Sequence, residues 1–209
     1  MIPVVVLASR NQGKIRELAV LLEPFGVTVK GLSEFPDIGE IEETGSTFAE
    51  NSLLKAATVS NLTGLVAVAD DSGLAVDALD GAPGVYSARY SEEAGRPATD
   101  ERNTEKVLTQ TASVPDKNRA CRFISAMAAA APDGRHIIAQ GVWEGILARE
   151  PSGTNGFGYD PVFFDPEMNM TAAEMSPEQK NSRSHRAKAC KKLLELWPAF
   201  WKETGGTSG

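Results

Sequence analysis

The 209-residue sequence is poor in the residues on which disulfide-rich and zinc-binding proteins depend, since it has only two cysteines and two histidines. Cys121 and Cys190 form neither a close pair nor a metal-ligand spacing. This argues against a disulfide framework and a zinc site, and it predicts a reducing, cytoplasmic location. A serine-type catalytic triad has no support either, because neither His136 nor His185 stands near a nucleophile elbow.

Long apolar runs and an excess of positive charge are also missing. No apolar stretch reaches the roughly 20 residues needed to cross a bilayer, and the run from Ile2 to Ala8 is too short and too β-branched for a signal peptide. Lys and Arg total 21 against 28 Asp and Glu, which gives a formal charge of −7. A chain of this charge, without a basic stripe interleaved with aromatics, is expected to bind neither nucleic acid nor a membrane.

With 42% hydrophobic and 23% charged residues, the chain can bury its own core, and its apolar pattern predicts an α/β fold. The continuous apolar runs over 4–8 and 65–69 are typical of strands buried on both faces. Two further β-prone tracts, Arg119 to Ala131 and His136 to Arg149, are joined by Pro132-Asp133-Gly134 as in a hairpin. The alanines of the first tract would suit a helix equally well.

Helices are predicted from apolar spacing and from capping residues. Ile15, Leu18, Leu21 and Leu22 recur at helical spacing until Pro24. Thr47 and Glu50 have capping-box spacing, as do Ser176 and Gln179. The three remaining helices are therefore expected from about Phe48 to Ser60, from Thr99 or Asp100 towards Leu108, and from about Pro177 to Trp201. No Pro- or Ser-rich linker divides the chain, so we expect one domain over 1–204, with a β-rich lobe between about 85 and 150, and a flexible tail over 205–209.

The loop Ser9-Arg10-Asn11-Gln12-Gly13-Lys14 lies between the first predicted strand and helix, where backbone amides and the helix dipole favour an anion. Arg10 and Lys14 add positive charge, so a phosphate group is the expected ligand. A P-loop is rejected, because Ala8 stands where the first glycine belongs and Ile15 where the magnesium-binding Ser or Thr belongs. The alternative is a polar loop with solvated charges.

Carboxylates occur in two adjacent pairs. Asp70-Asp71 follows the second strand, at what we expect to be its carboxyl end, where ligands bind in open α/β sheets. Together with Glu42-Glu43, this pair offers the oxygen ligands that Mg²⁺ prefers. Asn51 and Lys55 share one predicted helix face, from which Lys55 could reach the same phosphates. Taken alone, a turn-capping Asp or an exposed helix face explains each feature as well.

The glycine-rich segment 153–161 surrounds Phe157 and Tyr159 with three glycines. Such a segment lets the backbone approach a flat ligand closely while one ring offers a stacking face. It therefore indicates a base pocket. A hairpin loop with one buried aromatic ring is the alternative.

Polar residues interrupt the apolar stripe of the last predicted helix between residues 180 and 186. Lys180, His185 and Arg186 stand in this part, and only some of them can share a face. Isolated residues of these kinds are usually solvated. Their concentration here indicates that this part of the helix faces a polar cleft.

Taken together, these segments resemble the family of inosine triphosphate pyrophosphatases, also called non-canonical purine nucleoside triphosphate pyrophosphatases or XTP/dITP diphosphatases. The matching strings span almost the whole chain and are specific in this order: residues 7–14, 42–45, 48–56, 69–74, 81–90, 156–161 and 180–186. The resemblance implies a two-lobed mixed α/β structure with a long central sheet and the active site in a cleft between the lobes. It also implies a homodimer that hydrolyses ITP, dITP and XTP to the monophosphate and pyrophosphate, which cleanses the nucleotide pool of deaminated purines.

The resemblance assigns roles to individual residues. Asp71 corresponds to the proton acceptor and a Mg²⁺ ligand, and Lys55 to a phosphate contact. Glu42 corresponds to a second metal-site carboxylate, with the choice between Glu42 and its neighbour Glu43 left open. The residues that correspond to the triphosphate loop and to other substrate contacts are Ser9, Arg10, Asn11, Gln12, Gly13 and Lys14, then Ser72, Phe157, Gly158, Tyr159, Asp160, Lys180, His185 and Arg186. Ser9-Arg10 stands where relatives often carry Thr-Gly or Thr-Asn, and Ser9 keeps the hydroxyl.

The resulting hypothesis is that Mg²⁺, held by Glu42 and Asp71, bridges the triphosphate while Asp71 orients or deprotonates a water that attacks the α-phosphorus. One rival is a related pyrophosphatase that prefers pyrimidine or modified nucleotides. Another is a catalytically silent nucleotide sensor, which would lack a carboxylate or a phosphate-loop lysine.

Overall fold

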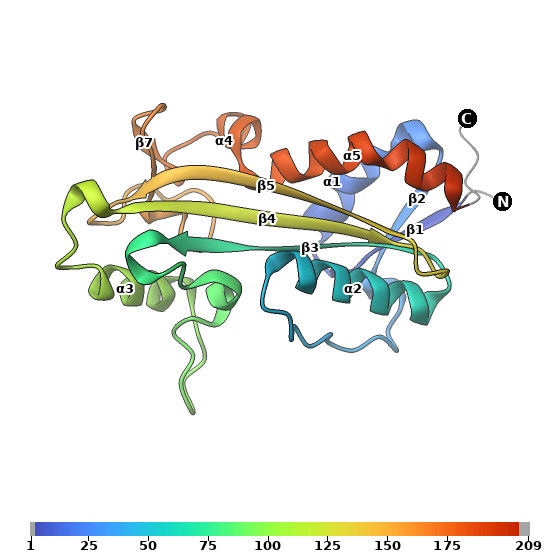
Figure 1. Ribbon diagram of the computed structural model, residues 1–209, viewed down its shortest axis with the longest axis horizontal. Coiled ribbons are helices and arrows are strands. Elements are labelled where there is room, and N and C mark those ends of the chain that lie inside the picture. The colour runs from blue at the N-terminus through green and yellow to red at the C-terminus, as the bar shows by residue number, and fades with distance from the viewer. Residues whose placement is uncertain (1–2, 205–209) are drawn as a thin grey trace. The chain divides into compact units, whose positions relative to one another are not determined.

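The computed structural model describes residues 3–204, and over this range the chain forms a mixed α/β structure, as predicted (Figure 1). Its sheet has seven strands in the order β2-β1-β3-β4-β5-β6-β7. The strands are β1 (Val4–Leu7), β2 (Thr28–Gly31), β3 (Val66–Val76), β4 (Ala120–Ala130), β5 (His136–Leu147), β6 (Phe163–Asp165) and β7 (Met170–Thr171). The α-helices are α1 (Gln12–Leu22), α2 (Phe48–Thr63), α3 (Asp100–Gln110), α4 (Pro177–Arg183) and α5 (His185–Glu203). Among the described residues, no helix is long and apolar enough to span a membrane.

The chain divides into two compact units. The first contains residues up to Asp71, Ala126–Gln140 and the chain from Ala189 onward, and the second contains Ser72–Ser125 and Gly141–Lys188. The second unit therefore differs from the expected lobe between about 85 and 150. The reason is that β3, β4 and β5 each contribute residues to both units, so the boundary cuts through strands instead of following a linker. The predicted tail over 205–209 lies outside the described residues.

The first unit is built on parallel strands. β1 pairs in parallel with both β2 and β3, with Val5 opposite Val29 and Val66. The valines of β1 that the sequence predicts to be buried on both faces are buried, since Val5 and Val6 are fully inaccessible. Leu18 and Leu22 of α1 and Trp197 of α5 pack into the same core as Val5. Its apolar spacing thus explains why α1 forms where predicted.

The second unit has an aromatic core. Phe123 of β4, Trp143 of β5 and Phe163 of β6 are in mutual contact, with ring centroids 4.5 to 6.3 Å apart. Val107 of α3 belongs to the same cluster, and Thr99 caps α3 by accepting a hydrogen bond from the Arg102 amide, as expected from the sequence. α3 is therefore anchored at its end and along its buried face.

β4 resolves the ambiguity of the alanine-rich tract in favour of a strand. Met127 and Ala129 contribute to one hydrophobic cluster of the first unit, while Ala128 and Ala130 contribute to another. Successive residues thus point to opposite faces, which is the two-residue period of a strand. The helix propensity of alanine is overridden because both faces of the strand are covered.

The expectation that Asp70-Asp71 ends its strand was wrong, because β3 continues to Val76. The residues after the acidic pair are as buried as those before it: Leu74 and Val76 are inaccessible to solvent. Gly73 permits this continuation, because a Cβ there would lie 2.2 Å from the Ser87 hydroxyl oxygen. That hydroxyl also accepts a hydrogen bond from the Leu74 amide at 2.9 Å.

The single C-terminal helix that the sequence predicts is divided in two at Ser184. The predicted capping box of Ser176 and Gln179 is present at the start of α4. Ser184 then adopts an extended backbone (ψ 151°), and its hydroxyl accepts a hydrogen bond from the Ala187 amide at 3.2 Å. Because Ser184 ends one helix and caps the next, α5 begins at His185.

Candidate active site

The β1–α1 loop lies where the sequence predicts an anion site, but several of its donors are already engaged. The Asn11 side chain accepts hydrogen bonds from the Gly13 and Lys14 amides, at 2.8 and 3.1 Å, and the Ser9 hydroxyl accepts one from the Asn11 amide at 3.1 Å. The Arg10 guanidinium donates to the carbonyls of Leu32 and Ile38, at 3.3 and 2.8 Å. In this loop Lys14 is therefore the cation that reaches a carboxylate.

Lys14 forms an ion pair with Asp70, with 2.7 Å between Nζ and Oδ2. The Asp70 side chain is only 6% exposed, whereas the Lys14 side chain is 30% exposed, so the carboxylate is shielded and the lysine remains accessible. Gln12 and Gly13, also predicted as substrate contacts, are exposed at the start of α1. An anion that approached this loop would meet a lysine already held in place by a carboxylate.

A second lysine is placed between two carboxylates in the same unit. Lys55 Nζ lies 2.6 Å from Glu43 Oε1 and 3.8 Å from Asp71 Oδ1. Glu42, which we predicted as the metal-site carboxylate, is exposed, whereas Glu43 faces Lys55. The structure therefore brings together Glu43, Lys55 and Asp71. The interpretation of 51–55 as an exposed helix face was wrong, because Asn51 is buried and the Lys55 side chain is 14% exposed.

Asn51 connects the two segments that carry these carboxylates. Its Nδ2 donates to Asp71 Oδ2 at 3.1 Å, and its Oδ1 accepts from the Gly45 amide at 2.7 Å. The Asn51 side chain is completely buried. It therefore fixes one oxygen of Asp71 and at the same time holds the segment that leads from Glu43 into α2. The sequence showed Asn51 only as a neighbour of Lys55, with no sign of this role.

These residues offer a charge arrangement suited to a metal-bound triphosphate. Carboxylate oxygens are the ligands that Mg²⁺ prefers, and lysines bind phosphates as point charges. Over the part of the chain that the structure describes, no group of three or more His, Cys, Asp or Glu side chains is arranged to hold a metal ion. The donor set nevertheless fits a hard cation that shares its remaining positions with phosphate and water, because Glu43 and Asp71 supply oxygens only.

The segment predicted as a base pocket presents one exposed ring. Phe157 is 76% exposed, and Lys180 Nζ lies over its ring, 5.1 Å from the centroid. The Asp160 carboxylate is buried, accepts a hydrogen bond from the Phe157 amide at 2.8 Å and pairs with Lys180. At Gly156 a Cβ would lie 2.0 Å from Asp160 Oδ2, so only glycine allows this close approach.

Tyr159 does not offer the second stacking face that the sequence suggested. Its ring is buried in the core of the second unit, and its hydroxyl donates to the Ser87 carbonyl at 2.9 Å. Burial raises the pKa of the Tyr159 phenol, so the group stays protonated. Ser72, predicted as a substrate contact, is exposed on β3. Of the two rings, Phe157 is thus the one available to a ligand.

His185 and Arg186 lie at the start of α5. The His185 ring stacks on Phe123, with centroids 4.8 Å apart and 20° between the planes. Arg186 is half-buried. Sequence reasoning missed Arg183, which donates to Asp165 Oδ2 at 2.7 Å, and Asp165 also accepts from the Trp143 indole at 2.9 Å. This network fixes the end of α4, the helix that carries Lys180.

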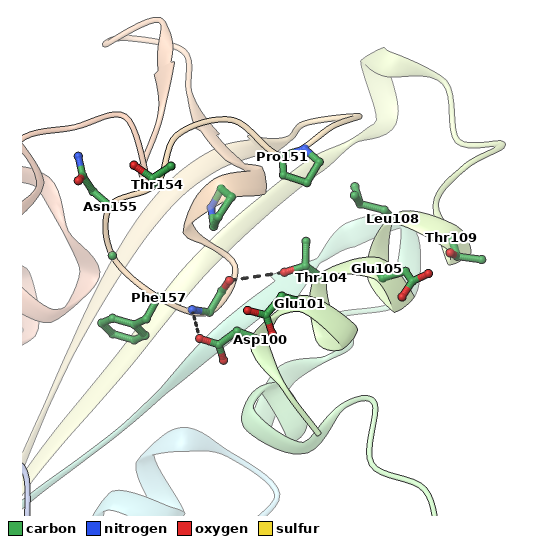
Figure 2. A pocket seen from close by; sticks show the side chains of 13 residues that line it. Asp100, Glu101, Thr104, Glu105, Leu108, Thr109, Pro151, Thr154, Asn155 and Phe157 are labelled. Carbon is green, nitrogen blue, oxygen red and sulfur yellow. Dashed lines mark hydrogen bonds between the residues drawn. The ribbon is translucent and has the colours of Figure 1, made fainter. Parts of the chain in front are cut away.

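A pocket of about 480 Å³ lies between α3 and the 151–161 loop (Figure 2). Asp100, Glu101 and Glu105 of α3 line it, together with Phe157 and Gly158 of the loop. Sequence reasoning used Asp100 only as a possible helix cap. In the structure its carboxylate accepts a hydrogen bond from the Gly158 amide at 2.6 Å.

Cys121 is confirmed as a core residue. It is completely buried in the core of the second unit. Burial raises the pKa of its thiol to about 12, so the nucleophilic thiolate is not populated near neutral pH. Cys121 thus offers no nucleophile.

The fold and these side chains define a class of α/β protein that carries lysines paired with carboxylates in one unit and an exposed aromatic ring in the other. Comparison with known proteins then identifies the family. The model of the Ham1 family matches residues 5–196, and the chain belongs to this family. The resemblance found in the sequence is thereby confirmed.

Individual relatives agree with this assignment. The chain is 56% identical to a dITP/XTP pyrophosphatase of Nitratidesulfovibrio vulgaris, covering 95% of this chain and 97% of that protein. It is 50% identical to a dITP/XTP pyrophosphatase of Shigella flexneri, covering 91% and 96%. Among solved structures, the Ham1 protein of Staphylococcus aureus matches with a TM-score of 0.86 at 39% identity, covering 94% and 98%. The nucleoside-triphosphatase / dITP/XTP pyrophosphatase of Mycobacterium abscessus matches with a TM-score of 0.79 at 46% identity, covering 91% and 98%.

Proposed function

We infer that this protein hydrolyses non-canonical purine nucleoside triphosphates, including dITP and XTP, to the monophosphate and pyrophosphate. The observation that carries this inference is the 56% identity, over nearly the full length of both chains, to a protein named dITP/XTP pyrophosphatase. The carboxylates and lysines that the reaction needs are present: Asp71, Glu43, Lys14 and Lys55. Their presence also disfavours a silent nucleotide sensor.

The mechanism assigns the proton transfer to Asp71. One oxygen of Asp71 is held by Asn51, which leaves the carboxylate a fixed direction from which to accept a proton from the attacking water. The water adds to the α-phosphorus as the bond to the pyrophosphate oxygen breaks. Negative charge then accumulates on the leaving pyrophosphate, and Lys14 and Lys55 neutralise it.

The cofactor we propose is Mg²⁺, held by Asp71 together with Glu43. Glu43 replaces Glu42 in this proposal because Glu43 shares Lys55 with Asp71, whereas Glu42 is exposed. A bound divalent cation supplies positive charge to the triphosphate and lowers the pKa of water. Lys55 Nζ lies between the two carboxylates, 2.6 Å from Glu43 Oε1 and 3.8 Å from Asp71 Oδ1. In the proposal, Glu43 and Asp71 would hold the cation and Lys55 would contact a phosphate oxygen of the substrate.

Base selection is assigned to the purine 6-keto group. Donors such as His185 or Arg186 can hydrogen-bond that oxygen, whereas the 6-amino group of adenine would leave them unpaired, so the site discriminates against adenine. Guanine also carries a 6-keto group, so rejection of dGTP requires a separate exclusion of its 2-amino group. Phe157 offers the stacking face. Lys180 lies over its ring, and Asp160 accepts a hydrogen bond from its backbone amide. We also propose that the protein acts as a homodimer in the cytoplasm, on the basis of the resemblance and of its cysteine content.

A product assay tests the proposed function. The purified protein is incubated with Mg²⁺ and dITP, XTP, dGTP, dATP or dTTP, and pyrophosphate is separated from orthophosphate. We expect pyrophosphate and monophosphate from dITP and XTP, with little product from dGTP and dATP. Orthophosphate release, a preference for dTTP, or no turnover would each contradict the proposal. These results would indicate, respectively, a γ-phosphatase, the pyrimidine-type relative and a sensor.

A further inference from the structure

The peptide that follows Phe157 is held in place from α3. The Gly158 amide donates to Asp100 Oδ2 at 2.6 Å, and the Thr104 hydroxyl lies 3.5 Å from the Gly158 carbonyl oxygen (Figure 2). On the preceding side, the Phe157 amide donates to Asp160. Consecutive amides on either side of the Phe157 carbonyl are thus bound to two different carboxylates, while the ring itself is exposed.

Packing alone does not fix this peptide. The pocket of about 480 Å³ lies beside it, and a Cβ built on Gly158 would meet no atom within 4 Å. The next residue, Tyr159, is anchored in the core, so packing holds the loop after Gly158, whereas the Phe157–Gly158 peptide on the pocket side depends on its hydrogen bonds. Asp100 provides the shorter of the two hydrogen bonds from α3 to Gly158.

α3 is a rigid support for such a contact. Val107 is fully buried in the core of the second unit. Asn103, one turn after Asp100, is buried as well: it accepts from the Ser91 amide at 2.8 Å and donates to the Ala88 carbonyl at 3.1 Å. Asp100 is the first residue of α3, where a negative charge interacts favourably with the helix dipole. Its carboxylate is therefore presented from a fixed element.

We propose that Asp100 is a positioning residue for base recognition, which acts through the Gly158 amide to fix the plane of the Phe157 ring on which the purine stacks. The proposal rests on the proposed function, because it concerns the base of that substrate. Asp100 need not touch the nucleotide. Asp100 holds the loop ordered before the nucleotide binds. Less of the stacking energy between the purine and Phe157 is then spent on ordering the loop.

The test compares substrates and ligands with and without a base. In Asp100→Ala, we expect KM for dITP to rise about 5-fold with kcat within about 2-fold of wild type, since a contact made equally in ground state and transition state affects KM. The inhibition constant of inorganic tripolyphosphate, which has no base, should be unchanged. Asp100→Asn keeps an oxygen acceptor and should restore most of the affinity for dITP.

Glu105→Ala is the matched control, because Glu105 lines the same pocket on the same helix. It removes one negative charge from the pocket without removing the acceptor of the Gly158 amide, and we expect wild-type KM. Asp100→Glu provides a second test that keeps the charge at the start of α3 and displaces the carboxylate by one methylene. We expect it to raise KM for dITP more than Asp100→Asn does, even if the alanine variant fails to fold.

Three results would overturn the proposal. The first is an unchanged KM in both Asp100→Ala and Asp100→Glu. The second is an equal loss of affinity for dITP and for tripolyphosphate, which would indicate a general structural role. The third is an effect of Glu105→Ala on KM as large as that of Asp100→Ala. This would indicate that the negative charge of the pocket, and not the hydrogen bond to Gly158, determines KM. Failure of the wild-type protein to turn over dITP would instead contradict the proposed function, so the two failures are distinguishable.

Discussion

Replacement of Asn51 by leucine removes the amide that connects Asp71 to the Gly45 backbone while keeping a side chain with the same branching and number of heavy atoms. Two hydrogen bonds are lost, at 3.1 Å to Asp71 Oδ2 and at 2.7 Å from the Gly45 amide. The bond to the carboxylate is expected to contribute about 1.5 to 3 kcal/mol and the neutral one about 0.5 to 1.5 kcal/mol. The better helix propensity of leucine offsets only a few tenths of a kcal/mol. The free energy of unfolding should therefore fall by about 2 to 4 kcal/mol.

The same substitution should also slow catalysis, because Asp71 loses the donor that fixes its direction. We expect kcat for dITP to fall by about 10- to 100-fold, in the range of a displaced general base. Unfolding in urea is followed by tryptophan fluorescence, to which Trp197 and Trp201 contribute from the core of the unit that contains Asn51. Initial rates with dITP give kcat at protein concentrations where the variant is folded.

Ser60→Ala on the same helix is the control. Ser60 is as buried as Asn51, and its hydroxyl makes one hydrogen bond, to the Leu65 carbonyl at 2.8 Å. We expect a loss of about 1 kcal/mol in stability and an unchanged kcat. If Asn51→Leu kept both wild-type stability and wild-type kcat, the role assigned to Asn51 would be refuted.

Burial by itself raises the pKa of Asp165, but hydrogen bonds from Arg183 and Trp143 outweigh this and hold the pKa below its usual value. The ionised Asp165 therefore stabilises the fold above about pH 4, and this contribution is lost as the pH falls through the lowered pKa. Asp165→Asn should lower stability at pH 7 by about 2 to 4 kcal/mol and flatten its pH dependence below pH 4, as measured by urea unfolding at several pH values; an unchanged profile would contradict this. Phe157→Ala should leave stability within about 0.5 kcal/mol, because the ring is exposed, and should raise KM for dITP about 10-fold or more through lost stacking; an unchanged KM would move base recognition elsewhere. Chelation by EDTA should abolish turnover of dITP, and added MgCl₂ should restore it; full activity in EDTA would exclude the proposed metal.

Elements whose signals are local could be predicted from the sequence. The β-branched run of β1, the apolar spacing of α1 and the caps of Thr99 and Ser176 all act within a few residues of where they stand, and the structure confirms each. Of the capping box predicted at Thr47, only the Thr47 half forms, because the Glu50 carboxylate accepts from the Ser46 amide and hydroxyl instead. The division at Ser184 has a local signal as well, namely a serine able to cap a second helix, but helical propensity on both sides concealed it.

Features that depend on tertiary contacts could not be predicted in this way. β3 extends past Asp70-Asp71 because the residues after Gly73 are buried against elements distant in sequence. Glu42 and Glu43 are adjacent and chemically alike, so the choice between them depends on the position of Lys55. Similarly, the partners of Asn51 and Asp100 are a strand residue and a loop amide that sequence spacing does not relate to them.

The most direct test of the central claim is hydrolysis of dITP in ¹⁸O-labelled water, with mass spectrometry of both products. Attack of water on the α-phosphorus predicts dIMP that carries one ¹⁸O atom and pyrophosphate that carries none. Label in the pyrophosphate, release of orthophosphate, or absence of turnover would contradict the account.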